Sequence, residues 1–347
     1  MRPEPTLLEP VFTPRIWGAR SLAPLFPHQS NLSEPIGEAW LTGHGCPVAT
    51  GPFAGKSLGA AWREMPAEWR GTRLAQEPEF PLLVKFLFPN DKLSIQVHPD
   101  DAYAAAHDPG GRGKTEMWYA MAAKEGAELL LGLKPGTNPE ALRAAIAGGT
   151  LEELLERWGV HPGEAFFVPA RAPHGIGPGM TLCEIQQYCD VTYRLYDYGR
   201  VDASGKPREL HVEKALAVMN FGKTTGGRTT PVEVREGALQ NTYLAACRYF
   251  AAEKWEFDAA VGARTGAAQF ELLIVLDGAG RLEWNGGANK YERAHAWLLP
   301  ATLGAYRLVP DRETGLLRAY VPDLAALRGE LRRRGLDKAA ISRVVFD

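Results

Sequence analysis

The sequence is poor in cysteine, with four in 347 residues, and no two of them have the Cys-x-x-Cys spacing. A chain of this length can bury a sizeable core and needs no disulfide framework to fold. We therefore expect Cys46, Cys183, Cys189 and Cys247 to be buried or incidental thiols of a cytoplasmic protein.

Long apolar runs and an excess of one charge are also missing. No stretch approaches the roughly 20 apolar residues that cross a bilayer, and the first 18 residues contain Glu and Pro where a signal peptide has an unbroken apolar core. The 39 basic and 41 acidic residues give a net charge of -2, which provides no electrostatic footprint for nucleic acid or an anionic membrane. The sequence therefore predicts a cytoplasmic protein without either partner, in which a few local cations must hold any anionic ligand.

What the sequence has in abundance is short strands separated by Gly, Asn and Asp turns. Two examples are FELLIVLDGAGRLEW at 270–284 and AHAWLLPATLGAYRLV at 294–309. Repeated short strands at this spacing predict a mainly β protein, built as a sandwich or a closed barrel. The length suggests roughly two such units, on a prior of about 150 residues each.

Helix signals are few and well separated. Asn138 and Pro139 form an N-cap and N1 pair, and Thr150 with Glu153 forms a possible capping box. We therefore expect two helices in an insertion at about 137–159, the second of them ended by Gly159.

Three further helix starts come from the same kinds of signal. Ser57 and Asp100 are predicted N-caps of short helices, and residues 210–222 are predicted to form a connecting helix followed by a linker at 224–228. Asp323 is predicted to cap the first helix of a helical C-terminal tail, 323–347.

Most of the candidate metal-ligating side chains lie between Leu82 and Met121. Gln96 and His98 are separated by one residue, so on a strand they point to the same face, and Glu116 follows. A second stretch, GEAFFVPARAPHGIGPG, supplies His174. Two imidazoles and a carboxylate suit a borderline divalent ion such as zinc, and the neutral amide of Gln96 would leave that ion a net positive charge.

Each of these residues alone is more often structural, since a lone His usually satisfies a hydrogen bond in a core or at a surface. Their combination changes the balance. Q-x-H followed by K-x-E, and then Gly163, Pro169 and His174 in register, resembles the two motifs of the cupin barrel. The sequence departs from the general cupin pattern in having Gln96 in place of a usual histidine, and in the late position of Glu116.

The wording of four segments resembles type I phosphomannose isomerase more closely than cupins in general. The segments are SIQVHPDD at 94–101, GKTEMWY at 113–119, PHGIG at 173–177 and EIQQYCDVTYRLYDYGR at 184–200. The resemblance covers about residues 5–320 and implies a zinc enzyme that interconverts mannose 6-phosphate and fructose 6-phosphate. It also implies two cupin domains, a catalytic one at 1–222 and a second at 223–322 that binds no metal, hence one zinc ion per chain.

The resemblance also implies roles for individual residues. The implied zinc ligands are Gln96, His98, Glu116 and His174. Arg194 is implied as the catalytic arginine, with Lys114 lining the pocket and Ser94 contacting the substrate.

The reaction itself asks for such groups. A proton must move between C1 and C2 of the sugar while negative charge builds on an enediolate, and a fixed cation stabilises that charge. Arg194 stays protonated and presents two donors in a plane, while Lys85 and Lys114 could neutralise the phosphate. Lys85 interrupts an apolar strand, so it either snorkels to an edge or points into a cavity.

Several points stay open at this stage. The general base is unassigned: Glu184 is a candidate that would also contact the substrate, with Asp100 or a zinc-bound hydroxide as others. Two alternative functions are a metal-dependent cupin dioxygenase and a sugar-phosphate-binding cupin without activity. The expected oligomeric state is a monomer or a weak homodimer.

Overall fold

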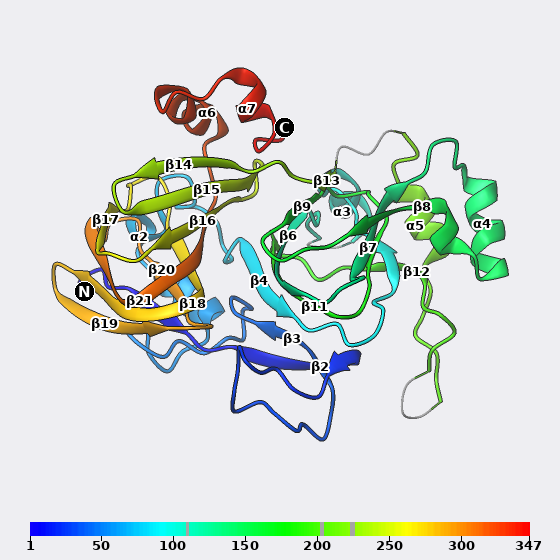
Figure 1. Cartoon of the computed structure of the whole chain (residues 1–347), viewed down its shortest axis with the longest axis horizontal. Coiled ribbons are helices and arrows are strands. Elements are labelled where there is room, and N and C mark those ends of the chain that lie inside the picture. Colours follow the sequence, from blue (N-terminus) through cyan, green and yellow to red (C-terminus); the bar gives the residue numbers. More distant parts are fainter. Residues whose placement is uncertain (109–110, 202–204, 223–225) are drawn as a thin grey trace.

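The computed structural model describes residues 1–108, 111–201, 205–222 and 226–347. It is mainly β, as predicted, and its sheets form two lobes that lie side by side (Figure 1). We call the seven-stranded and five-stranded sheets the first lobe, and the nine-stranded sheet the second lobe. Strand pairing within all three sheets is antiparallel.

The first lobe contains the stretch that the sequence singled out. Its seven-stranded sheet has the order β13, β9, β6, β11, β4, β3, β2, and its five-stranded sheet has the order β12, β5, β10, β7, β8. The bounds are β2 Val11–Ala19, β3 Ile36–Trp40, β4 Leu82–Leu87, β5 Ile95–Val97, β6 Glu116–Ala123, β7 Glu128–Leu133, β8 Leu155–Gly159, β9 Ala165–Val168, β10 His174–Ile176, β11 Met180–Gln187, β12 Tyr193–Tyr196 and β13 Gly227–Arg228.

The second lobe has the strand order β1, β20, β18, β21, β16, β15, β14, with β17 paired to β21 and β19 to β18. The bounds are β1 Thr6–Leu8, β14 Val232–Glu236, β15 Leu239–Ala246, β16 Ala251–Phe257, β17 Val261–Arg264, β18 Glu271–Trp284, β19 Gly287–Glu292, β20 Ala296–Leu299 and β21 Ala305–Tyr320.

Helices lie outside the sheets, and most of the predicted caps are confirmed. The side chains of Ser57, Asp100, Asn138 and Asp323 each accept a backbone N–H in the first turn of the helix that follows. The helix bounds are α1 Leu58–Glu64, α2 Ala67–Arg70, α3 Asp101–His107, α4 Pro139–Gly148, α5 Val212–Val218, α6 Leu324–Arg333 and α7 Lys338–Ser342, with a 3-10 turn at Leu151–Leu154. Within the described residues, no helix is both long and apolar enough to cross a membrane.

The second helix expected in the insertion is wrong. Residues Leu155–Gly159 form strand β8, which pairs with β7, and Thr150 caps nothing through its side chain in the described structure. Leu151 and Leu155 are both buried in one cluster, so their spacing of four mimicked a helix. Trp158 instead donates its indole N–H to the carbonyl of Leu131 on β7, 3.2 Å away.

The division into domains at 222/223 stays a prediction, and residues 223–225 lie outside the described residues. Two pairings cross it: β1 joins β20 in the second lobe, and β13 joins β9 in the first. The expected linker at 224–228 is therefore wrong for Gly227 and Arg228.

Strand β4 is buried on both faces, which explains its unbroken apolar run. Leu82, Val84 and Phe86 pack in a cluster that also contains Leu272 and Ile274 of β18, so this face joins the two lobes. The alternate residues, Lys85 among them, therefore point into the first lobe. All four cysteines lie in described segments, buried and outside any disulfide, as predicted.

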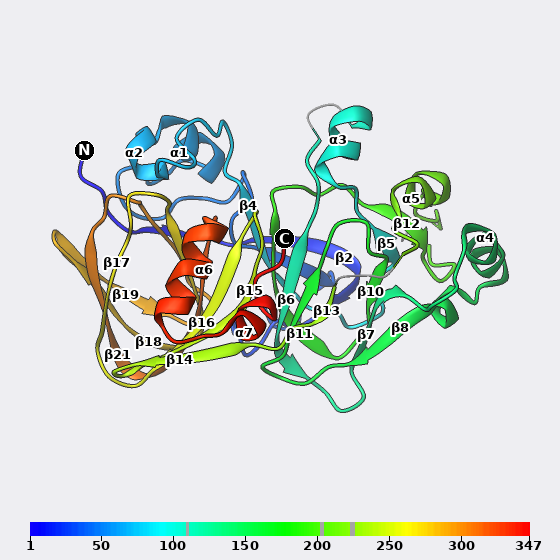
Figure 2. The ribbon, with the colours of Figure 1, turned by 90° about the horizontal axis from the view of Figure 1, so that it is seen from above.

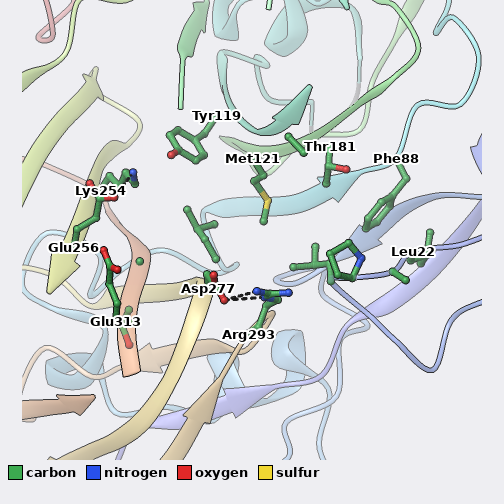
Figure 3. A pocket seen from close by; sticks show the side chains of 17 residues that line it. Leu22, Phe88, Tyr119, Met121, Thr181, Lys254, Glu256, Asp277, Arg293 and Glu313 are labelled. Carbon is green, nitrogen blue, oxygen red and sulfur yellow. Dashed lines mark hydrogen bonds and ion pairs between the residues drawn. The ribbon is translucent and has the colours of Figure 1, made fainter. Parts of the chain in front are cut away.

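A separate cavity of about 460 Å³ lies between the lobes (Figure 3). Tyr119, Met121 and Thr181 line it from the first lobe. From the second lobe, Asp277 accepts hydrogen bonds from Arg293 across its floor. None of the predicted site residues is among the described residues that line this cavity, so it is not the site that the sequence indicates.

The interior of the second lobe is polar at one end. Arg318 of β21 bridges two carboxylates, with N–O distances of 3.1 Å to Glu253 and 2.6 Å to Glu271. The side chains of both glutamates are 2% exposed. Tyr306 and Tyr320 donate further hydrogen bonds to them, so the network is extensively satisfied.

Replacing Arg318 with leucine is expected to destabilise the protein strongly. It would leave two buried carboxylates without their cation, which costs about 3–5 kcal/mol of unfolding free energy. Urea unfolding would measure this, with Arg307→Leu on the same strand as the matched control. Arg307 is 61% exposed and its pair with Glu283 is 3.6 Å long, so that variant should change stability by less than about 1 kcal/mol. Equal losses in the two variants would contradict this role.

Candidate metal centre and active site

The predicted metal ligands come from facing sheets of the first lobe. Gln96 lies on β5 and His98 directly follows it, while His174 begins β10 of the same five-stranded sheet. Glu116 begins β6 in the seven-stranded sheet. Strand register places His174 opposite Gln96, which brings the two distant sequence stretches together.

Gln96 and His98 share one face of the β5 region, as predicted. The residues between and beside them, Ile95 and Val97, are fully buried in a different apolar cluster together with Tyr193. This alternation sends the apolar side chains to the outer side of the sheet and leaves the polar ones facing the interior.

The three strongest ligand candidates converge closely. Single ligand atoms of His98, Glu116 and His174 all lie within 4.8 Å of one another, and all three residues are buried. Nε2 of His174 is 3.3 Å from Oε1 of Glu116, and Nε2 of His98 is 3.8 Å from Oε2. Two ligands of a tetrahedral zinc ion lie about 3.4 Å apart when each bond is about 2.1 Å, so these separations fit one ion.

Both imidazoles are oriented by backbone carbonyls. Nδ1 of His98 donates to the carbonyl of Val191 at 2.8 Å, and Nδ1 of His174 donates to that of Ala172 at 2.9 Å. Each Nε2 therefore carries its lone pair toward the centre, an arrangement common around metal-bound histidines. Burial lowers the pKa of His174 to about 4, and burial with the charge of Lys114 holds the pKa of His98 well below its usual value. Both rings are thus neutral donors at pH 7.

The carboxylate of Glu116 is also placed to bind a cation. Oε1 of Glu116 is buried and has no hydrogen-bond partner among the residues that the structure describes. The ammonium of Lys114 lies 2.8 Å from Oε2 of Glu116 and 3.1 Å from Nε2 of His98. Nε2 of Gln96 lies 3.4 Å from Nε2 of His174, and rotating this amide by 180° would turn its oxygen toward the same centre. The donor set fits a divalent cation.

A cavity of about 500 Å³ opens beside this cluster. It is lined by most of the predicted site residues, namely Lys85, Ser94, Gln96, Lys114, Glu184 and Arg194. His98, Glu116 and His174 do not line it themselves, but Gln96 and Lys114 contact them directly. A substrate in the cavity would therefore meet the metal centre at these two side chains.

Arg194 on β12 is half-buried in the wall of this cavity. Its Nε lies 3.3 Å from the hydroxyl oxygen of Ser94, and one terminal nitrogen donates to the carbonyl of Glu209 at 2.9 Å. Burial, followed by the charge of Arg208, lowers the pKa of Arg194 from its very high usual value. The cation remains charged at pH 7 and is poorly compensated, as an oxyanion-binding group requires.

Lys85 points into the cavity instead of snorkelling to an edge. Its ammonium is 3.2 Å from Asp190 and 3.7 Å from Glu184, and it lies over the ring of Trp40. Burial works to lower the pKa of Lys85, but the surrounding carboxylates outweigh it and raise that pKa. Lys85 is therefore a fixed cation that is largely neutralised by the protein.

Glu184 lines the cavity beside Lys85, whose ammonium is 3.7 Å from its carboxylate. The indole N–H of Trp118 donates to it at 3.0 Å, and burial followed by the charge of Glu116 raises its pKa. A carboxyl group with a raised pKa beside a cavity is suited to accepting and returning a proton. Asp100, the other carboxylate considered as a base, caps α3 and pairs with Arg171, and it does not line this cavity within the described structure.

Sequence reasoning missed four charged residues of the cavity, namely Arg15, Glu38, Asp190 and Arg208. Arg15 and Arg208 line it near Arg194, and Asp190 anchors Lys85. Asp190 lies inside the quoted segment at 184–200, whereas Arg15 lies in none of the four segments that carry the resemblance. Arg208 comes from a segment without regular pattern, so nothing in the sequence pointed to it.

Comparisons with known proteins agree on one family. Residues 6–131 match the family described as phosphomannose isomerase type I, catalytic domain. The mannose-6-phosphate isomerase ManA of Bacillus subtilis is 36% identical over 316 residues, which cover 89% of this chain and 96% of the relative. The mannose-6-phosphate isomerase of Streptococcus mutans is 35% identical over 314 residues, covering 89% and 96%. The crystal structure of the Bacillus subtilis mannose 6-phosphate isomerase superposes with a TM-score of 0.83 at 31% identity, covering 91% of this chain and 99% of that one.

Proposed function

The chain belongs to the type I phosphomannose isomerase family, and we propose that it is a zinc-dependent enzyme interconverting mannose 6-phosphate and fructose 6-phosphate. The observation that carries the proposal is the convergence of His98, Glu116 and His174 beside a cavity that also holds Arg194. His98, Glu116 and His174 would supply metal ligands, and Arg194 would supply a cation that stabilises the negative charge developing on the substrate.

We assign the metal to Gln96, His98, Glu116 and His174, with one zinc ion per chain. Two neutral imidazoles, one carboxylate and one amide oxygen leave the ion a net positive charge, and a bound zinc ion would act as a Lewis acid that polarises a substrate oxygen. The unpartnered Oε1 of Glu116 and the two Nε2 lone pairs support this ligand set. Lys114, whose ammonium contacts the cluster, would turn toward the cavity and contact the substrate.

The remaining residues handle the sugar. We propose that Arg194 donates two hydrogen bonds to the oxygens of the enediolate, and that Ser94, which contacts Arg194, holds the substrate in register. Glu184 is our candidate for moving the proton between C1 and C2, because its pKa is raised and it lines the cavity. A residue that both accepts and returns a proton works best when its pKa lies near the pH at which the enzyme operates.

The phosphate needs cations that the protein has not already neutralised. Lys85 and Lys114 were the sequence candidates, and both line the cavity. However, Lys85 is paired with Asp190 and Lys114 with Glu116. We propose that Lys85 mainly sets the charge balance of the site. Arg208 also lines the cavity but is itself paired with Asp197, so Arg194 is the arginine of the cavity wall that has no carboxylate partner among the described residues.

The proton-transfer mechanism predicts exchange with solvent. When mannose 6-phosphate is converted in heavy water, an enediolate formed by a side-chain base should acquire deuterium at C1 of fructose 6-phosphate or C2 of mannose 6-phosphate. Nuclear magnetic resonance of the recovered sugars after prolonged turnover would measure this. Complete conversion without any deuterium at these carbons would instead indicate a hydride shift and contradict the role of Glu184.

A further inference from the structure

A further cavity, of about 660 Å³, lies under the C-terminal tail, apart from the cavity of Arg194 and from the one between the lobes. Its walls come from the loop between β9 and β10, the turn between β15 and β16, and helices α6 and α7. Figure 2 shows the tail lying across the junction of the two lobes. Phe346 of the tail stacks on Phe167 of β9 with ring centroids 4.2 Å apart, and Val345 bridges to Ala246, so the tail is fixed to both lobes.

The charged lining of this cavity is strongly basic. Five cationic side chains face two carboxylates, although the chain as a whole has a net charge of -2. The cations are Arg171, Arg248, Arg328, Arg332 and Lys338, and the carboxylates are those of Asp100 and Asp347.

Two of these cations are uncompensated. Arg171 pairs with Asp100, Arg248 with Asp101 and Arg328 with Asp347. Arg332 and Lys338 make no ion pair or side-chain hydrogen bond with any other described residue. The unpaired cations give the cavity a net positive charge, which would attract an anion.

Much of the remaining lining is apolar, including Phe346, Val345 and Ile341. Guanidinium groups match phosphate oxygens in geometry, and an apolar wall beside them suits an attached organic part. We propose that this cavity is a binding site for a small phosphorylated organic anion, held by Arg332 and Lys338 and distinct from the isomerase cavity.

The position of the cavity links it to the metal centre. The backbone N–H of Arg171 donates to the carbonyl of His98 at 2.8 Å, and its Nε donates to the carbonyl of Val218. Arg171 has a φ of +72°, a conformation that non-glycine residues hold only when their surroundings enforce it. An anion that competes with Asp100 for Arg171 would therefore act on the loop that leads into His174 of β10.

Titration calorimetry of the zinc-loaded protein with ADP tests the proposal, because ADP combines a diphosphate with a flat organic part. We expect saturable binding that weakens as salt is added, and no binding of uncharged adenosine. Arg332→Ala and Lys338→Ala should each weaken ADP binding about tenfold, the loss expected for one charge-assisted contact. Both residues are exposed, so the variants should fold normally.

Two controls locate the site. Arg333→Ala removes an exposed arginine of the same helix that does not line the cavity, and it should bind ADP like the unaltered protein. Arg194→Ala should also retain ADP binding, because Arg194 belongs to the other cavity. Absence of saturable binding, an equal loss in Arg333→Ala and Arg332→Ala, or loss of binding in Arg194→Ala would each overturn the proposal.

Discussion

Replacing His98 with alanine is expected to remove both the bound metal and the isomerase activity. Among the described residues, Nε2 of His98 is one of two imidazole lone pairs that face the centre, and its Nδ1 is fixed by the carbonyl of Val191. Losing it leaves one imidazole and one carboxylate with the weakly donating amide of Gln96, a poorer ligand set for zinc. The Lewis acid is worth several kcal/mol to the reaction. We expect turnover to fall by about a thousandfold or more.

Elemental analysis of the purified variant, together with an activity assay, would check both parts of this prediction. His161→Ala is the matched control, since His161 is an exposed histidine of the same lobe outside the cluster. That variant should keep its metal and its activity. If His98→Ala retained a full complement of zinc, the ligand set would have to be redrawn.

Replacing Arg194 with alanine is expected to separate metal binding from turnover. Arg194 lies in the cavity wall and contacts Ser94 and a backbone carbonyl, and within the described structure its side chain forms no hydrogen bond or ion pair with His98, Glu116 or His174. The variant should therefore keep one zinc ion per chain. Its kcat should fall by about a hundredfold to a thousandfold, the cost of removing a preorganised donor to an oxyanion.

Arg194→Lys refines this test, because it restores the charge but not the planar pair of donors. We expect it to recover only part of the lost kcat. Metal content and steady-state kinetics of both variants would be measured side by side. Normal turnover by Arg194→Ala would show that the developing charge is stabilised by another group.

Much of the site could be predicted because short-range patterns determine it. The alternation of Gln96 and His98 on a strand is a local property, and so are the caps at Ser57, Asp100, Asn138 and Asp323. The resemblance to a known family then predicted that His174 and Arg194 belong to the same site as Gln96 and His98. Strand register places both residues beside this stretch, since Gln96 lies opposite His174 on one neighbouring strand and Arg194 on the other.

The errors came from contacts distant in sequence. Leu151 and Leu155 have helical spacing, yet β8 forms because β7 offers it an open edge. No local sequence pattern predicts that β13 pairs with β9, or that Arg208 lines the same cavity as Arg194. The partners of Lys85 are likewise a property of the assembled sheets, because Asp190 lies more than a hundred residues away.

The tail gained a structural role that its sequence did not suggest. Arg332, Arg333 and Arg334 are consecutive in the sequence, but the structure gives their side chains different surroundings. Arg332 lines the cavity under the tail, Arg333 does not, and Arg334 pairs with Glu330. The difference between neighbours on one helix is what makes the anion site testable.

A coupled assay of mannose 6-phosphate conversion tests the central claim most directly. Fructose 6-phosphate formation would be followed in the protein as purified, after removal of metal with a chelator, and after addition of zinc. We expect activity in the first sample, its loss in the second and its return in the third. No activity in the zinc-loaded protein, or full activity after complete removal of the metal, would contradict the account.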